Sequence, residues 1–154
     1  MTIVRRFIMA FLVVGGMCLA HPLSAQRSVG SVSSVRLAFQ NIDQVALDFG
    51  VDTAAMRRRA VQRLGAAGIA VVEDANQPEL SIAVRVPKSL APVDDGFLLV
   101  EMRLLETTSS DPQRELWKAR GPATRFTTFG SLRQLVPEQL EQRLDSLAAA
   151  HSGT

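Results

Sequence analysis

Two arginines one helical turn apart form the pair in this sequence best suited to binding an anion. Arg59 and Arg63 belong to a basic cluster that also contains Arg57 and Arg58. Guanidinium groups bind carboxylate and phosphate through paired N–H donors. The cluster spreads over more than half of the circumference of a helix, however, which is typical of a solvated face. Arg59 and Arg63 are therefore predicted to bind an anion only if this helix carries a site at all.

The acidic residues do not form a recognisable catalytic pair. The pairs at 94–95 and 73–74 are adjacent in predicted turns, whereas glycosidase carboxylates flank the substrate about 5–9 Å apart. Followed by Gly96, the first pair also lacks the alternating oxygen ligands of a calcium loop. We therefore predict no catalytic residue and no metal ligand. Pairing of Glu101 or Glu115 with another acid across strands cannot be read from the sequence, which leaves a carboxylate-based hydrolase as an alternative.

Cysteine and histidine are almost absent after the first 25 residues. Cys18 and His21 lie in that leader, which leaves one histidine, His151, near the end of the chain. This composition excludes structural disulfides, thiol catalysis and Cys/His zinc sites, and it argues against a Ser-His-Asp triad. From Gln26 onward, 15 basic residues balance 15 acidic ones. The neutral balance of charges argues against nucleic-acid binding. From the missing residue types and motifs, we predict neither a cofactor nor an enzymatic activity.

The first 25 residues are predicted to be a secretory signal peptide. Arg5 and Arg6 precede an apolar run at 7–20, and cleavage is expected after Ala25. The run has 14 residues, fewer than the ~20 that a membrane span needs. We therefore expect no stable span after cleavage, and a periplasmic or secreted protein. The excess of arginine over lysine is typical of a bacterium with a GC-rich genome.

Two other kinds of leader are less favoured. A lipoprotein would carry its lipid on Cys18, but Met17 stands where a small residue is needed. A twin-arginine signal would use Arg5 and Arg6. The very apolar run that follows and the lack of a cofactor motif favour the general secretory route instead.

Behind the leader, the hydrophobic pattern predicts a single α+β domain at 35–148. The segment 26–34 is rich in Ser and Gly and is expected to be flexible, and 149–154 is expected to be a disordered tail. Alternation of apolar and polar residues predicts strands, most clearly at 80–86 and 97–105. The predicted order is β-α-β-β-β-β(-β)-α. This order indicates a mostly antiparallel sheet of four to six strands with two helices packed on one face.

Both predicted helices are amphipathic and have recognisable ends. The first begins after the N-cap Asp52 and ends before Gly68, for which we expect a positive φ. The second begins at a capping box, 131–134, and either kinks at Pro137 or starts there after a short turn. The residues at 41–50 fit either a short strand or an extended loop.

The order of these elements resembles a group of small exported bacterial proteins of unknown function. The resemblance rests on the helix end at 63–69, on the alternating strand after Pro78, on a strand that contains Trp117, and on a Leu-rich C-terminal helix. It covers about 35–148. More distantly, the chain is similar to envelope-assembly accessory domains such as the outer-membrane lipopolysaccharide-assembly lipoprotein, in which two helices also pack on a sheet. That family is lipid-anchored, unlike the leader predicted here, and no site residue is carried over.

One predicted strand carries apolar residues on both of its faces. Phe97, Leu99 and Leu105 share a face with Glu101 and Arg103, which is the face that a one-sided sheet leaves to water. Burial of such side chains is worth roughly 1.5–3 kcal/mol each. Exposure of all three as one patch would therefore be costly and would mark a contact surface.

Three explanations for this face stay open. The loops at 41–50 and 87–95 could fold over it, with Phe49 or Leu90 as lids. A second chain, either a protein partner or another copy of this one, could cover it. Scattered exposure of single apolar residues would need no explanation.

The sequence therefore favours an exported, non-catalytic binding or accessory domain that acts through protein contacts. Its predicted contact residues are Phe97, Leu99 and Leu105, which would bind a partner or a second copy. A periplasmic carrier or sensor of an anionic lipid or polysaccharide, using Arg59 and Arg63, is the alternative.

Overall fold

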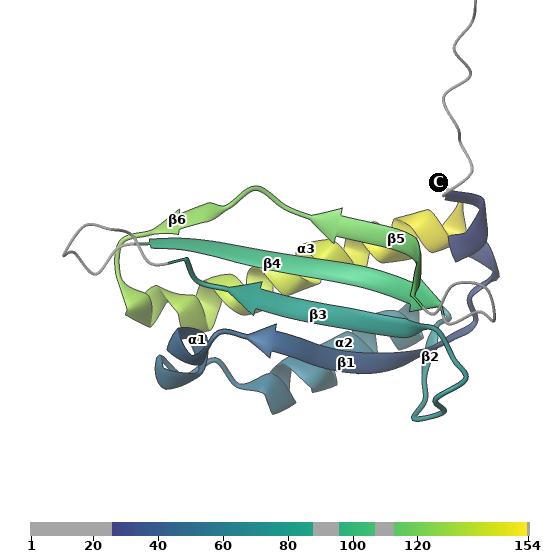
Figure 1. Cartoon of the computed structure of the whole chain (residues 1–154), viewed down its shortest axis with the longest axis horizontal. Helices are drawn as coiled ribbons and strands as arrows, with labels where there is room; N and C mark the ends of the chain where they lie inside the picture. The colour runs from purple at the N-terminus through teal and green to yellow at the C-terminus, as the bar shows by residue number, and fades with distance from the viewer. Residues whose placement is uncertain (1–25, 88–95, 107–112, 154) are drawn as a thin grey trace, which may run out of the picture.

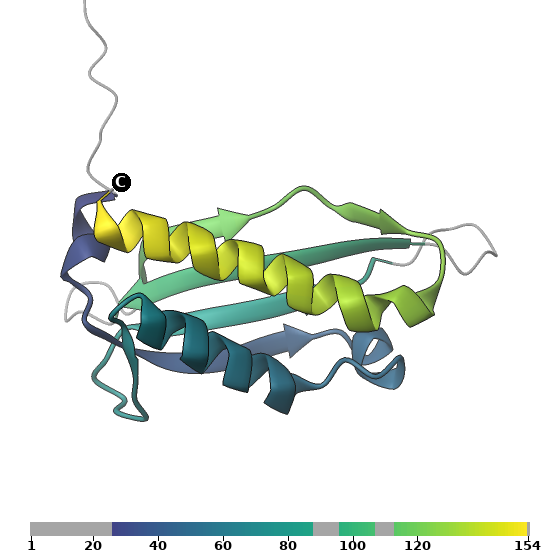
Figure 2. The ribbon, with the colours of Figure 1, turned by 180° about the vertical axis from the view of Figure 1, so that it is seen from behind.

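Six strands form one mixed sheet, and two long helices pack on one of its faces (Figures 1 and 2). The computed structural model describes residues 26–87, 96–106 and 113–153. The strands are β1 (Ser34–Ile42), β2 (Ala70–Val71), β3 (Glu79–Arg85), β4 (Gly96–Glu106), β5 (Arg114–Arg120) and β6 (Thr124–Phe126). The helices are α1 (Gln44–Asp48), α2 (Thr53–Ala66) and α3 (Leu132–Ser152), with 3-10 turns η1 (Gln26–Ser31) and η2 (Phe129–Ser131). The α+β class and the predicted order are confirmed, with α1 added.

The strands lie in the order β2-β1-β3-β4-β5, and β6 pairs with β4. β1 runs parallel to both β2 and β3, whereas β4 is antiparallel to β3, β5 and β6. Parallel strands need a long crossover, usually a helix, and α2 provides it between β1 and β2. The antiparallel meander expected from consecutive strands therefore begins only at β3.

The core lies between the sheet and the two long helices. From α2 it receives Met56, Ala60 and Leu64. The sheet contributes alternate residues of its strands, and Trp117 packs against the same core. The buried side chains of α3 recur at three- and four-residue spacing: Leu132, Val136, Leu140, Leu144 and Leu147. Within the described part of the chain, no helix combines the length and apolarity needed to cross a membrane.

Both ends of α2 form as predicted. The Asp52 carboxylate accepts hydrogen bonds from the backbone N–H groups of Ala54 at 2.8 Å and Ala55 at 3.1 Å. Gly68 follows the helix with φ +80°, in the left-handed conformation that glycine adopts without cost. The chain then turns into β2, and Ile69 beside it is buried in the core.

The start of α3 differs from the predicted capping box. The Ser131 hydroxyl donates to the Thr128 carbonyl at 2.6 Å and does not cap the helix. η2 precedes the helix instead, so the chain already turns before Leu132. Of the two alternatives for Pro137, a start of the helix at this residue is excluded, because α3 runs through it. Pro137 lies in the second turn and removes a single backbone N–H donor there.

Both ends of the domain are more ordered than the sequence led us to expect. Val29 and Val32, in the segment predicted to be flexible, are buried in the core. α3 continues to Ser152, through the predicted disordered tail. The two ends pack together, and His151 Nδ1 lies 3.1 Å from the Val29 carbonyl oxygen. Val29 and Val32 therefore anchor this Ser/Gly-rich segment in the core.

Residues 41 and 42 complete β1, and the residues that follow form the short helix α1 instead of a further strand or an extended loop. Asp43 caps it by accepting a hydrogen bond from the Val45 N–H at 3.0 Å. Phe49, at its end, stacks on Phe129 with 4.6 Å between ring centroids, and Phe129 contacts the buried ring of Phe126. Phe49 therefore packs in an aromatic cluster beside the core and is not a lid on the other face of the sheet. The other proposed lid, at position 90, lies outside the described residues.

Candidate functional site

The face of the sheet opposite to the helices carries a positive excess. In the described structure no helix lies on this face, which is turned toward the viewer in Figure 1. We call it the open sheet face. The register of the strands places on it Arg36, Gln40, Glu79, Ser81, Ala83, Arg85, Phe97, Leu99, Glu101, Arg103, Leu105, Glu115, Lys118, Arg120 and Arg125. Six of these side chains are basic and three are acidic, whereas the chain from residue 26 onward is neutral.

A shallow hollow of about 140 Å³ lies in this face. It forms because Ser81 and Ala83 of β3 are small, whereas the facing residues of β4 are long. The cross-strand partner of Ser81 is Arg103, and that of Ala83 is Glu101. The lining residues are Gln40, Asn41, Ser81, Ala83, Arg85, Glu101, Arg103, Leu105 and Gln113.

Glu101 is the buried charge at the centre of the open sheet face. Its side chain is only 5% exposed. Its carboxylate is hydrogen-bonded and ion-paired with Arg103. On β5, Lys118 Nζ lies 3.6 Å from Oε1, and Arg120 Nε lies 3.8 Å from Oε2. One carboxylate thus holds three cations from two neighbouring strands.

These cations keep Glu101 ionised. Burial by itself raises the pKa of the carboxyl, because it removes water from the charged form. The hydrogen bond from Arg103 and the positive charges of Arg103, Lys118 and Arg120 outweigh burial, so the pKa lies below its usual range. A carboxyl with a lowered pKa is a poor general acid at neutral pH. Among the described residues that line the hollow, Glu101 is the single acid.

Arg85 is the cation of the hollow that has no partner among the described residues. It is exposed at the end of β3, opposite Leu99 of β4. Among the described residues its guanidinium makes neither a hydrogen bond nor an ion pair. Arg103, by contrast, pairs with Glu101 and lies 3.9 Å from Glu115. Arg85 is therefore free to bind an anion that approaches the open sheet face.

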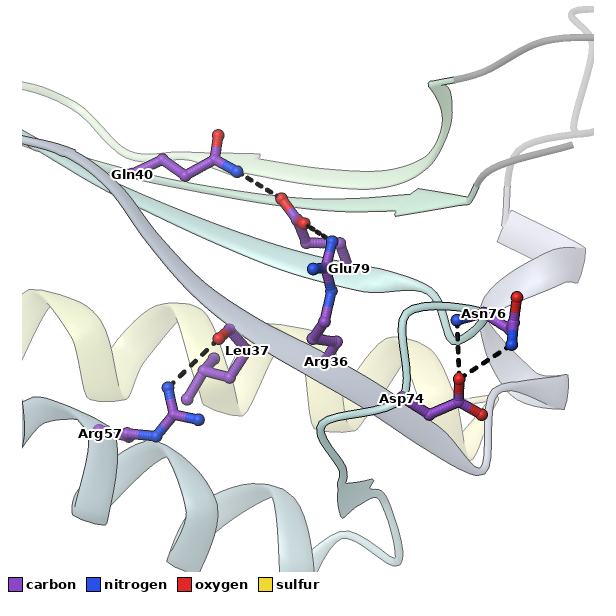
Figure 3. A network of polar contacts seen from close by, with 7 residues as sticks. All are labelled: Arg36, Leu37, Gln40, Arg57, Asp74, Asn76 and Glu79. Carbon is purple, nitrogen blue, oxygen red and sulfur yellow. Dashed lines mark hydrogen bonds and ion pairs between the residues drawn. The ribbon is translucent and has the colours of Figure 1, made fainter.

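The other side of the open sheet face is neutralised internally. Arg36 of β1 is ion-paired with Glu79 of β3, and Gln40 Nε2 donates to the same carboxylate at 2.5 Å (Figure 3). Arg57 reaches from α2 to the edge of β1, where its Nη1 donates to the Leu37 carbonyl at 3.3 Å. The ion pair of Arg36 with Glu79 leaves no excess charge at this pair of residues.

Arg59 and Arg63 lie on the helical layer, away from the open sheet face. Arg59 Nη1 lies 2.7 Å from Glu141 Oε1 on α3. Arg63 lies 3.7 Å from the other oxygen of Glu141 and 3.5 Å from Asp145 Oδ1. The structure thus brings the two arginines together around carboxylates of the neighbouring helix, and an added anion would compete with them. Their role in anion binding stays a prediction.

The three apolar residues predicted as partner contacts lie on the open sheet face but do not form one patch. Phe97 is 44% exposed, Leu99 is 8% exposed and Leu105 is half-buried. Leu99 and Leu105 are six residues apart on an extended strand, which corresponds to about 20 Å. The ion pairs of Glu101 and Arg103 separate them.

Sequence reasoning missed the β5 cations and the position of Arg85. The sequence does not show that Arg85 lies in the lining of a hollow. Lys118 and Arg120 reach Glu101 only through the register of β4 against β5, which shifts between Leu104 and Leu105. A search for alternating charges on predicted neighbouring strands could have found the cluster.

Within 26–87, 96–106 and 113–153, no three His, Cys, Asp or Glu side chains lie together in a way that could hold a metal ion. His151 faces the Val29 backbone.

In structure, the chain is similar to bacterial lipoproteins. The minor lipoprotein of Acinetobacter baumannii matches with a TM-score of 0.45 and 10% identity, over 76% of this chain and 91% of that one. Rare lipoprotein B of Shewanella oneidensis matches with a TM-score of 0.44 and 15% identity, over 78% of this chain and 94% of that one. A PelC dodecamer structure from Paraburkholderia phytofirmans matches with a TM-score of 0.47 and 18% identity, over 76% of this chain and 87% of that one.

No family model matches the sequence. No curated protein matches it either. The structural matches do not assign a function to this chain.

Proposed function

We propose that this protein is an exported, non-catalytic binding or accessory domain of the bacterial envelope that contacts its partner through the open sheet face. The observation that carries this proposal is the buried Glu101 with its three cations on that face. A sheet face that meets only water needs no carboxylate removed from water. Burial of a charge costs free energy unless partners compensate for it, so a cluster of this kind favours a specific arrangement of the surrounding cations.

Pre-organised arginines are suited to binding. Arg103 is held by Glu101, so its guanidinium loses less conformational freedom when a partner binds. Arginine and aromatic residues are enriched at protein interfaces and dominate their binding energy. The open sheet face combines Arg85 and Arg103 with the exposed ring of Phe97. This combination supports a contact surface for a macromolecule.

The chemistry of the hollow supports binding rather than catalysis. Glu101 has a lowered pKa, and the other lining residues that the structure describes include no histidine, cysteine or second acid. Acid–base catalysis needs a group whose pKa lies near the working pH and within reach of the substrate. The lining offers hydrogen-bond donors and positive charge instead.

Site-specific photocrosslinking in the periplasm tests this proposal. A photoreactive residue is placed at Gln40 or Lys118, which are exposed on the open sheet face, and in a matched variant at Gln62, which is exposed on α2. We expect crosslinked species of defined mass from the first two positions and none from Gln62. A crosslink to a second copy of the chain would identify the partner as a homodimer. Crosslinks from Gln62 alone would place the contact on the helical layer and refute the proposal.

A further inference from the structure

We propose that the hollow of the open sheet face binds a carboxylate side chain of an acidic peptide segment in a partner protein, with Arg85 as the anchor. The inference rests on the proposed function and names the chemistry of the partner. It starts from the donors that line the hollow. Within the part of the chain that the structure describes, the side chains of Arg85, Ser81 and Asn41 have no hydrogen-bond partner. A guanidinium, a hydroxyl and an amide together form a donor set that suits a carboxylate.

The charge around the hollow selects an anion. Glu101 provides one negative charge to Arg103, Lys118 and Arg120, so these four residues keep a positive excess. Arg85 adds a further positive charge that no described residue offsets. Charge complementarity of this kind favours an acidic partner and speeds its approach. An acidic segment can pair with Arg85 while Glu101 continues to hold Arg103 in place.

The size of the hollow selects a side chain over a whole small molecule. Its volume is about 140 Å³, below the roughly 300–1,000 Å³ of ligand pockets. The carboxylate of an aspartate or glutamate is attached through a short flexible chain, so it can enter the hollow by itself. The carboxylate of an acidic sugar is attached directly to the ring, which would have to enter with it.

The apolar residues beside the hollow also favour a peptide. Leu99 is the cross-strand neighbour of Arg85, and Phe97, two residues away on β4, is exposed. Apolar side chains that flank an acidic residue in a peptide could contact Phe97 while the carboxylate binds Arg85. A polyanion without apolar groups would leave this ring in water. The occupant is therefore an acidic peptide segment, and apolar neighbours of its acid would strengthen the binding without being required for it.

Calorimetric titration with a hexaglutamate peptide at low ionic strength tests the inference. The protein is purified from the periplasm, and hexaglutamine is the uncharged control peptide. We expect hexaglutamate to bind with an affinity that falls as salt is added, and hexaglutamine not to bind. Arg85→Glu should lower the affinity about tenfold or more. The matched control Arg58→Glu makes the same change of net charge on exposed α2 and should leave the affinity within about twofold.

Several outcomes would overturn the inference. If Arg85→Glu leaves the affinity for hexaglutamate unchanged, or if Arg58→Glu lowers this affinity by the same factor, the binding is non-specific electrostatic attraction and the inference is wrong. Arg85-dependent binding of polygalacturonate or of phosphatidylglycerol vesicles, without binding of hexaglutamate, would assign another class of ligand. Thermal unfolding checks the fold of each variant, and Arg85→Gln, which removes the charge without reversing it, replaces Arg85→Glu if the latter does not fold.

The inference and the proposed function can fail separately. Suppose that crosslinks form from Gln40 and Lys118 but that hexaglutamate binding does not depend on Arg85. The open sheet face would then still be the contact surface, and the proposed carboxylate site would be wrong. Suppose instead that hexaglutamate binding depends on Arg85 but that no crosslink forms from these two positions. The carboxylate site would then stand, and the proposed contact surface would be wrong.

Discussion

Glu101 determines how the charges of the open sheet face are arranged. Its neighbours on β5 would repel one another and Arg103 if no carboxylate lay between them. Because the carboxylate is almost fully buried, its hydrogen bond from Arg103 is poorly screened by water. The sequence showed Glu101 and Arg103 on one face of a strand. It could not show that two further cations, from residues about twenty positions later, would converge on the same carboxylate.

Replacement of Glu101 should destabilise the fold in a pH-dependent way. We expect Glu101→Gln to lower the free energy of unfolding by about 1–3 kcal/mol at pH 7, because Arg103, Lys118 and Arg120 lose their shared anion. The pKa of Glu101 is lowered in the folded state. Its contribution is therefore complete above the pKa of the unfolded state and is lost as the pH falls through the folded pKa.

Urea unfolding of the wild type and of Glu101→Gln at pH 7 and pH 3 measures this contribution. The difference between the two proteins should shrink at the lower pH. Glu115→Gln is the control, since Glu115 is exposed and lies 3.9 Å from Arg103, and it should change little at either pH. A difference that is the same at both pH values would show that the charge of Glu101 does not stabilise the fold.

At the scale of elements, the predictions that held were those fixed by local geometry. The alternation of β3 and β4 determines which side chains leave the core, since successive strand residues point to opposite faces. The ends of α2 could be predicted because each depends on one residue type. The Asp52 carboxylate accepts hydrogen bonds from free N–H groups of the first turn, and the glycine at position 68 adopts a positive φ. α1 was missed because Val45, Leu47 and Phe49 alternate like a strand, whereas the Asp43 cap starts a helix.

A pair of glycine substitutions separates backbone conformation from packing at the end of α2. A Cβ at Gly68 or at Gly65 would meet no atom within 4 Å, but only Gly68 has a positive φ, +80°. We expect Gly68→Ala to destabilise by about 1–2 kcal/mol. Gly65→Ala, inside the helix, should stabilise by about 0.5–1 kcal/mol. Thermal or urea unfolding measures both, and equal effects of the two substitutions would contradict the left-handed conformation at Gly68.

At the scale of the whole molecule, the sequence predicted the two-layer arrangement but not the details that depend on distant contacts. The helices were predicted to cover one face, and they do (Figure 2). The parallel pairing of β1 with β3 and the packing of η1 against α3 join segments far apart in the chain. Arg59 and Arg63, predicted as a pair, meet acids of α3 that no local pattern could place beside them.

Export is a prediction that concerns the whole chain. If the leader is a general secretory signal, the mature protein begins at Gln26 and carries no lipid. Intact-mass measurement of the protein from the periplasmic fraction should give the mass of residues 26–154. A mass that includes a lipid on Cys18, together with palmitate labelling that is lost in Cys18→Ser, would identify a lipoprotein instead.

Backbone chemical-shift mapping tests the central claim, that the open sheet face is the binding surface, most directly. The labelled protein is titrated with hexaglutamate, and the amide shifts of the described elements are followed. We predict that the largest changes fall on β3 and β4 around Ser81, Arg85 and Arg103, which line the hollow. Changes that instead gather on α2 and α3 around Arg59 and Arg63 would contradict this account and place the anion site on the helical layer.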